Sequence, residues 1–197
     1  MSLPGLTGQS LMENKMKTLI ILCAPCGVGK STIRELIAQR NQLPDFACID
    51  TDAVGLNWHD YKGTDHENQY QTDCLKRADE ISGNKNIFFV SAGMNPPNFY
   101  NYVDLPASIG RTFFIGMTCS DEEITKRLKA RPAERQTDSD EFIKTQHEYS
   151  AWFKRRRGKF QLFIDNTNHT AEETAGVIEE FMSRYGKYAE GAPVIRR

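Results

Sequence analysis

One short segment constrains the fold of this 197-residue chain more than any other. It follows an almost wholly apolar run at 18–24 and precedes a segment at 31–40 in which apolar residues recur at helical spacing. The segment reads Ala24-Pro25-Cys26-Gly27-Val28-Gly29-Lys30-Ser31-Thr32. Gly27 and Gly29 allow the backbone to curl so that successive N–H groups point inward, and the N-terminal end of a helix adds positive potential there. A strand, a glycine loop and a helix in this order predict an α/β fold with an anion-binding loop.

The same loop carries the chemistry of a nucleotide-phosphate site. Lys30 can reach the β and γ phosphates, and the Ser31 hydroxyl is a hard oxygen ligand suited to Mg²⁺. The loop departs from the Walker A consensus at Ala24, where the consensus has glycine. An ordinary glycine-rich turn is the alternative, but the Lys-Ser pair in its strand–helix context disfavours it. We therefore predict that one continuous segment binds nucleotide, namely Cys26, Gly27, Val28, Gly29, Lys30, Ser31 and Thr32.

The cysteines indicate a reducing environment. Five of them are scattered along the chain, and an odd number at irregular spacing argues against a disulfide framework. We therefore expect a cytoplasmic protein. Cys23 and Cys26 also have the spacing of a redox dithiol, but that pattern overlaps the phosphate loop, so we interpret it as a coincidence. A redox role would make nucleotide binding sensitive to dithiothreitol.

Composition excludes several classes of protein. Hydrophobic residues make up 39% and charged residues 26% of the chain, so it is neither a low-complexity nor a fully disordered protein. The formal net charge of −1 disfavours a nucleic-acid partner, because no excess of positive charge is available to neutralise phosphates. No apolar run approaches the length that spans a bilayer, so we expect no membrane partner.

Strand-like and helix-like segments alternate along the chain. Short apolar runs typical of strands covered on both faces occur at 18–24, 46–50, 87–91, 112–118 and 160–164. Helical patterns occur at 31–40, 65–82 and 120–129, from 138 onward and from 170 onward. This alternation predicts a parallel sheet between helical layers. We expect one domain at 17–185, a disordered leader or expression remnant at 1–16, and a tail at 186–197.

On the phosphate loop and this alternation, the chain resembles the small P-loop kinases of the nucleoside, nucleotide and shikimate kinase superfamily. The resemblance covers residues 17–185. It implies a three-layer P-loop NTPase sandwich with a five-stranded parallel sheet of order 2-3-1-4-5. It also implies ATP as phosphate donor, Mg²⁺ as cofactor and a short lid at 131–140.

Two carboxylates follow the second strand, at the edge where parallel sheets bind ligands. Asp50 and Asp52 are expected to project on the same side of the chain, because they lie two residues apart. Similar kinases place an aspartate here as substrate ligand and base. The resemblance thus assigns Asp52 to the acceptor hydroxyl and Asp50 to the Mg²⁺ water shell. Turn or helix-capping aspartates are the alternative.

Three arginines occur at four-residue spacing after the fourth strand. They are Arg127, Arg131 and Arg135, which would share one helical face up to the proline that follows Arg131. By resemblance, Arg127 packs on the adenine, and Arg131 and Arg135 contact the transferring phosphate. A solvated basic face is the alternative. After the fifth strand, Asn166 and Thr167 are candidates for contacts with the base or ribose, and a plain turn explains them nearly as well.

The acceptor side is less defined. Trp58 and Tyr61 lie in a polar segment that would overhang the acceptor, where they could sandwich a nucleobase or anchor the segment to the body. Gly93, at the end of the third strand, permits close approach of a ligand. We predict phosphate transfer from ATP to a hydroxyl of a small molecule, most favourably a nucleoside. The alternatives are a sugar, gluconate-like, antibiotic or polynucleotide 5′-hydroxyl kinase, a switch NTPase, or a module that binds nucleotide without turnover.

Overall fold

The computed structural model describes residues 16–132 and 135–186. Its centre is a five-stranded parallel sheet of order β2-β3-β1-β4-β5. The strands are β1 (Lys17–Cys23), β2 (Phe46–Asp50), β3 (Asn86–Ser91), β4 (Ile109–Thr118) and β5 (Leu162–Asp165). The predicted fold and strand order are confirmed. The expected leader at 1–16 and tail at 186–197 lie almost wholly outside the described residues.

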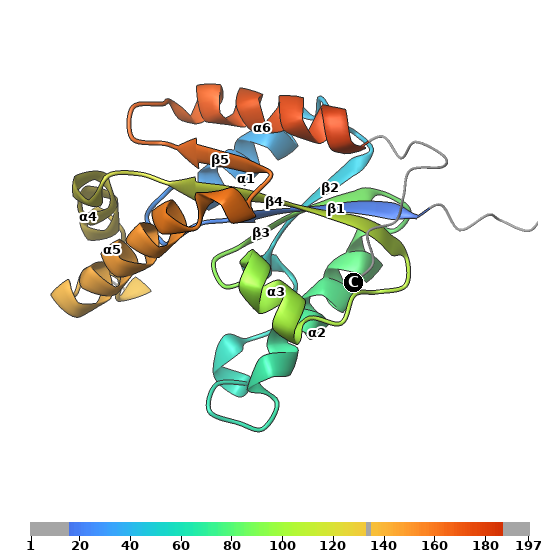
Figure 1. Ribbon diagram of the computed structural model, residues 1–197, viewed down its shortest axis with the longest axis horizontal. Helices are drawn as coiled ribbons and strands as arrows, with labels where there is room; N and C mark the ends of the chain where they lie inside the picture. Colours follow the sequence, from blue (N-terminus) through green and yellow to red (C-terminus); the bar gives the residue numbers. More distant parts are fainter. Residues whose placement is uncertain (1–15, 133–134, 187–197) are drawn as a thin grey trace, which may run out of the picture.

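Helices cover both faces of the sheet (Figure 1). On one face lie α1 (Lys30–Arg40) and α6 (Ala171–Gly186), and on the other lie α2 (Tyr70–Ser82) and α3 (Pro96–Tyr102). Past the carboxyl end of β4, at the left of Figure 1, lie α4 (Asp121–Lys129) and α5 (Asp140–Arg155). None of the helices in the described part of the chain is long and apolar enough to cross a membrane.

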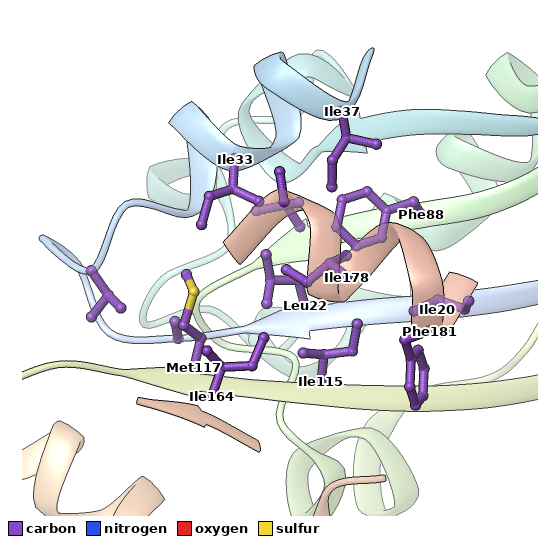
Figure 2. Packing of buried hydrophobic residues seen from close by; sticks show 14 of the residues in the cluster. Ile20, Leu22, Ile33, Ile37, Phe88, Ile115, Met117, Ile164, Ile178 and Phe181 are labelled. Carbon is purple, nitrogen blue, oxygen red and sulfur yellow. The ribbon is translucent and has the colours of Figure 1, made fainter. Parts of the chain in front are cut away.

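Strand β1 is buried on both faces, which explains why its sequence is a continuous apolar run. Ile20 and Leu22 point into a core cluster shared with α1 and α6, as Figure 2 shows. Leu19 and Ile21 belong to a second cluster on the opposite face. Alternate residues of the strand thus contribute to two cores, and the sheet is fixed between two helical layers. That rigid sheet positions the loops at its carboxyl end.

Some element boundaries differ from the sequence-based expectation. The helix expected at 65–82 begins at Tyr70, after a 3₁₀ turn at Glu67–Gln69. The short helix α3 was not predicted, although Asn95 caps it by accepting a hydrogen bond from the N–H of Asn98, and Pro96 occupies its first position. Its seven residues are too few to produce a helical period that sequence analysis would detect.

The close packing around Gly116 of β4 predicts that a larger residue there destabilises the protein. A Cβ there would lie 2.8 Å from Cγ of Phe160, and the Phe160 ring cannot easily retreat because it stacks on Phe153 at a centroid distance of 5.3 Å. We expect Gly116→Ala to lower the free energy of unfolding by about 1–3 kcal/mol through overpacking. Urea denaturation measures the change. Gly176→Ala is the matched control, because a Cβ at that position of α6 meets nothing within 4 Å. Equal stability of Gly116→Ala and the wild type would contradict the prediction.

Candidate active site

The glycine loop joins β1 to α1 and has the backbone that its sequence predicts. Gly27 has φ +85° and Gly29 has φ +105°, both in the left-handed region that favours glycine. Gly27 is also closely packed, since a Cβ would lie 3.0 Å from Cγ of Leu128. Among the described residues other than glycine, positive φ occurs at Asn41 and Gln136. Ala24 therefore needs no left-handed backbone, and its departure from the consensus is sterically compatible with the loop.

Two predicted nucleotide-site residues, Arg127 and Asn166, donate hydrogen bonds to this loop. The carbonyl oxygen of Val28 accepts hydrogen bonds from Arg127 Nη1 at 2.9 Å and from Asn166 Nδ2 at 3.0 Å. Asn166 is only 4% exposed, and its Oδ1 accepts a further bond from the hydroxyl of Thr174 at 2.6 Å. Both ends of the Asn166 side chain are thus engaged within the protein. The observed role of Asn166 is to position the phosphate loop, and adenine packing by Arg127 stays a prediction.

The lysine of the loop is folded back onto it. Lys30 Nζ donates to the carbonyl oxygens of Ala24 at 2.7 Å and Pro25 at 2.8 Å. Burial lowers the pKa of Lys30, the charge of Asp50 opposes that effect, and the charge of Arg131 adds to it. The ammonium group therefore lies in an environment that lacks full charge compensation. Phosphate oxygens would supply the missing negative charge.

Ser31 and Asp50 come together although they are far apart in sequence. The Ser31 hydroxyl donates to Oδ2 of Asp50 at 3.2 Å. Both are hard oxygen donors, and Mg²⁺ in nucleotide sites is usually held by one or two protein oxygens, with water and phosphate completing its shell. No group of three or more His, Cys, Asp or Glu side chains suited to a metal occurs within residues 16–132 and 135–186. The residues present fit a Mg²⁺ site shared with phosphate, and binding of Mg²⁺ by Ser31 and Asp50 stays a prediction.

This pair predicts a change in metal requirement. We expect Asp50→Asn to raise the Mg²⁺ concentration needed for half-maximal nucleotide-dependent turnover by roughly tenfold or more, because an anion next to the metal shell is lost. A Mg²⁺ titration at saturating nucleotide measures the shift. Asp45→Asn, in the exposed turn before β2, is the control variant. An unchanged Mg²⁺ requirement in Asp50→Asn would remove Asp50 from the metal site.

Asp52 does not lie on an extended strand with Asp50. Strand β2 ends at Asp50, and a 3₁₀ turn at Thr51–Ala53 begins directly after it. Asp50 Oδ1 accepts a hydrogen bond from the N–H of Asp52 at 3.2 Å, so Asp50 caps this turn. The expectation that both side chains project on one side assumed extended backbone through Asp52, and that assumption is wrong. A role of Asp52 toward an acceptor stays a prediction. Asp52 is exposed.

A cleft of about 500 Å³ lies in the segment that connects β2 to α2. Its lining residues are Gly55, Leu56, Asn57, Asp60, Tyr61, His66, Gln69 and Asp73. Tyr61 was predicted on the acceptor side and is part of this lining. Trp58 is absent from it. Along the chain its lining begins at Gly55, after β2 has ended at Asp50 and the turn at Thr51–Ala53 has followed. Asp50 and Asp52 are not among the lining residues.

The two predicted aromatic residues pack against a third. The rings of Trp58 and Tyr61 each contact Tyr70 edge to face, with centroid distances of 5.1 Å. The Tyr61 hydroxyl also donates to Oδ2 of Asp73 at 3.2 Å. Of the two interpretations left open by the sequence, this arrangement favours anchoring of the segment to α2. Contact of Trp58 or Tyr61 with a nucleobase stays a prediction.

Gly93 lies in the turn after β3, close to the start of α2. Its carbonyl oxygen accepts hydrogen bonds from Gln71 Nε2 at 3.2 Å and from Asn98 Nδ2 at 3.0 Å. A Cβ on Gly93 would lie 3.3 Å from Gln71 Nε2. An alanine there would therefore require the Gln71 amide to shift slightly. Contact of Gly93 with a ligand stays a prediction.

The three arginines do not share a helix. Helix α4 ends at Lys129, so Arg127 lies within it, and Arg131 and Arg135 lie beyond it. The reason is that the residue before a proline is disfavoured in helical backbone, which affects Arg131 directly. Residues 133–134, within the expected lid at 131–140, lie outside the described part of the chain. A contact of Arg131 or Arg135 with phosphate is still a prediction.

Of the remaining predicted nucleotide contacts, Thr32 is exposed in the first turn of α1. The Thr167 hydroxyl donates to the carboxylate of Asp165, as in an ordinary polar turn.

Cys23 is buried, its Sγ donates to the carbonyl oxygen of Met94 at 2.8 Å, and burial raises its pKa. A buried thiol of this kind lacks thiolate character, which supports coincidence as the origin of its spacing from Cys26.

Sequence reasoning missed two residues of α5. Gln146 Oε1 accepts a hydrogen bond from the N–H of Cys26 in the phosphate loop, at 2.9 Å. The Tyr149 hydroxyl donates to the carbonyl oxygen of Ala92 at 2.7 Å. The available signal was a polar residue at a buried helical position: Ile143, Gln146 and Phe153 follow one face of α5 and are all buried.

The chain is similar to known proteins at two levels. The family model described as "AAA domain" matches residues 20–148, which is more than half of the chain. No curated protein sequence matches significantly. Among solved structures, shikimate kinase from Bacteroides thetaiotaomicron is 15% identical with a TM-score of 0.56, over 84% of this chain and 98% of that one.

Two further structures have similar values. The gluconokinase from Sinorhizobium meliloti 1021 is 15% identical with a TM-score of 0.56, over 87% of this chain and 94% of that one. The tunicamycin resistance protein of Deinococcus radiodurans is 13% identical with a TM-score of 0.55, over 87% and 97%. At these identities the likeness concerns the fold. The chain therefore belongs to the AAA domain family, and its fold is that of the small P-loop kinases.

Proposed function

We propose that the protein transfers the γ-phosphate of ATP to a hydroxyl group of a small molecule without negative charge, with a nucleoside as first candidate. The observation that carries the proposal is the hydrogen bond of Ser31 to Asp50, whose charge also acts on Lys30. The cleft is lined by residues that come later in the chain, from Gly55 to Asp73. Together these features supply a phosphate loop, a pair of hard oxygen donors and a space for an acceptor.

Each group has a role in such a transfer. Lys30 gathers charge on the β and γ phosphates, and the inward-facing N–H groups of the loop orient them. Asp52 orients the acceptor hydroxyl and takes its proton. Arg131 and Arg135 neutralise charge on the transferring group. Ser31 and Asp50 would hold Mg²⁺, which when bound neutralises charge on the phosphates.

The lining of the cleft indicates the charge of the acceptor. Two of its eight lining residues, Asp60 and Asp73, are acidic, and none of the eight is lysine or arginine. Carboxylate or phosphate recognition normally uses arginine or lysine, and an anion is repelled by a nearby carboxylate such as that of Asp60. Asp73 contributes less repulsion, because its Oδ1 lies 3.5 Å from Lys76 Nζ and its Oδ2 accepts from the Tyr61 hydroxyl. The acceptors named in the similar structures, shikimate and gluconate, are anions. A neutral nucleoside or sugar fits this cleft better than those acceptors or a polynucleotide end.

An ATP-consumption screen tests the proposal. The panel contains neutral nucleosides, neutral sugars, aminoglycosides, tunicamycin, shikimate, gluconate and nucleoside monophosphates. We expect turnover with a neutral hydroxyl acceptor and none with the anionic ones. Phosphate release independent of any acceptor would instead indicate a switch NTPase, and ATP binding without turnover a binding module. Preference for shikimate or gluconate would contradict the inferred acceptor charge while leaving the kinase activity intact.

A further inference from the structure

Helix α5 contacts the phosphate loop and the loop after β3 through two consecutive turns. Gln146 is 8% exposed, and its Oε1 accepts the N–H of Cys26 at 2.9 Å. The hydroxyl of Tyr149, three residues later, donates to Ala92 at 2.7 Å and accepts from Asn95 Nδ2 at 3.1 Å. One face of α5 thus makes side-chain hydrogen bonds to the ends of two adjacent strands, β1 and β3.

Further contacts fix this face of α5 in place. The hydroxyl of Ser150 bonds to that of Thr118 at the end of β4, and both residues are fully buried. Phe153 is also fully buried, and its ring meets the Tyr149 ring edge to face at 4.9 Å. The helix therefore has little freedom to slide along the sheet. A polar side chain held this firmly fixes the position of the backbone group to which it bonds.

The two contacted loops belong to opposite halves of the candidate site. The Cys26 N–H lies in the loop that would hold the donor phosphates. Ala92 and Asn95 lie on either side of Gly93 in the chain. The carbonyl oxygen of Gly93 accepts a hydrogen bond from Gln71 at the start of α2, on the acceptor side. We propose that Gln146 and Tyr149 are positioning residues through which α5 sets the donor loop and the acceptor-side loop at a fixed separation. This inference rests on the proposed function for the identity of the two halves.

The hydrogen bonds of Gln146 and Tyr149 are expected to determine where the two loops lie, beyond the effect of packing alone. Loss of the Gln146 amide leaves the partly buried Cys26 N–H without its acceptor. A donor that loses its partner is costly where water does not replace it, so the loop is expected to move toward another partner. Loss of the Tyr149 hydroxyl removes partners from Ala92 and Asn95 but keeps the ring. Transfer between two bound groups is sensitive to displacements of about 1 Å, so either change should reduce turnover.

Two variants and one control test the proposal. Gln146→Met removes the amide at similar volume, and Tyr149→Phe removes only the hydroxyl. Thr145→Val is the control, because the Thr145 hydroxyl donates within α5 to the carbonyl of Glu141 and contacts neither loop. Amide hydrogen exchange is measured on each full-length variant. The affinity for ATP and the acceptor kcat/KM are measured on the same preparations.

We expect exchange about fivefold faster or more at residues 25–29 in Gln146→Met, and at 92–98 in Tyr149→Phe, with Thr145→Val unchanged at both. ATP affinity should fall in Gln146→Met alone, and acceptor kcat/KM should fall in Tyr149→Phe at unchanged ATP affinity. Exchange that is unchanged, or raised equally throughout the chain, overturns the positioning role. A different outcome would separate this inference from the proposed function. If the variants show the expected loop exchange but the wild-type protein consumes no ATP with any acceptor, the positioning contacts stand and the proposed function is refuted.

Discussion

Lys30→Met is expected to lower kcat for ATP consumption by about 10²- to 10³-fold, the range found when one preorganised charge-stabilising donor is removed. Lys30 Nζ now bonds to the carbonyls of Ala24 and Pro25, and burial lowers its pKa. A partly buried ammonium whose hydrogen-bond partners are carbonyl oxygens gains when phosphate oxygens approach, and that gain grows as charge moves onto the β–γ bridge. The side chain thus acts mainly on the transfer step.

Steady-state kinetics with ATP and the best acceptor from the screen measure this effect. Methionine keeps most of the aliphatic stem, so the loop should retain its fold and its thermal midpoint. Lys144→Met removes an exposed charge from α5 and serves as control. If Lys30→Met retained more than a tenth of wild-type kcat, the loop would not be the phosphate-transfer site. ATP affinity is measured separately, because a loss confined to binding would assign Lys30 to ground-state attraction.

Local sequence patterns predicted the donor half of the site well. Gly27 and Gly29 adopt the left-handed backbone that makes glycine necessary there, and α1 starts at Lys30 as the motif requires. These features depend on residues adjacent in the chain, where backbone sterics decide the outcome. The buried strands were recognisable for a similar reason, since a strand covered on both faces cannot alternate polar and apolar residues.

The acceptor half was less predictable because it depends on contacts between distant segments. Asp52 was placed on extended backbone, but it lies in a 3₁₀ turn in which the Asp50 carboxylate accepts a hydrogen bond from its N–H. Tyr61 was a candidate base contact, yet it packs on Tyr70 and bonds to Asp73 of α2. Asn166 was expected to face the nucleotide, and it bonds to the loop beneath. In each case the sequence pattern placed the residue after the expected strand and left its contact partner undetermined.

The charge distribution illustrates the same limit. A net charge of −1 disfavours a nucleic-acid partner but says nothing about where charges gather. In the structure, the ammonium of Lys30 lies at the phosphate loop, whereas the cleft after β2 contains carboxylates and no lysine or arginine among its lining residues. Asp73 of that cleft is paired with Lys76, whose Nζ lies 3.5 Å from its Oδ1. Such local arrangements of charge are set by the fold and cannot be read from the net charge.

Asp52→Asn is expected to lower kcat by about 10²-fold or more if Asp52 takes the proton of the acceptor hydroxyl. The variant should fold normally, because Asp52 is exposed and its hydrogen bond to Asp50 uses the main-chain N–H. Asparagine keeps the shape and the capacity to contact a hydroxyl but cannot accept a proton. The loss should therefore appear in kcat, with the affinity for ATP unchanged.

Asp60→Asn provides the matched control for this test, because Asp60 lines the cleft and carries the same charge. Removal of that charge should alter the acceptor KM and leave kcat within a few-fold of wild type, since a lining carboxylate acts on binding and not on proton transfer. Asp52→Glu should restore part of the activity, because a carboxylate returns at a displaced position. A kcat for Asp52→Asn within threefold of wild type would exclude Asp52 as the base. An equal loss in both asparagine variants would instead assign both carboxylates to the electrostatics of the cleft.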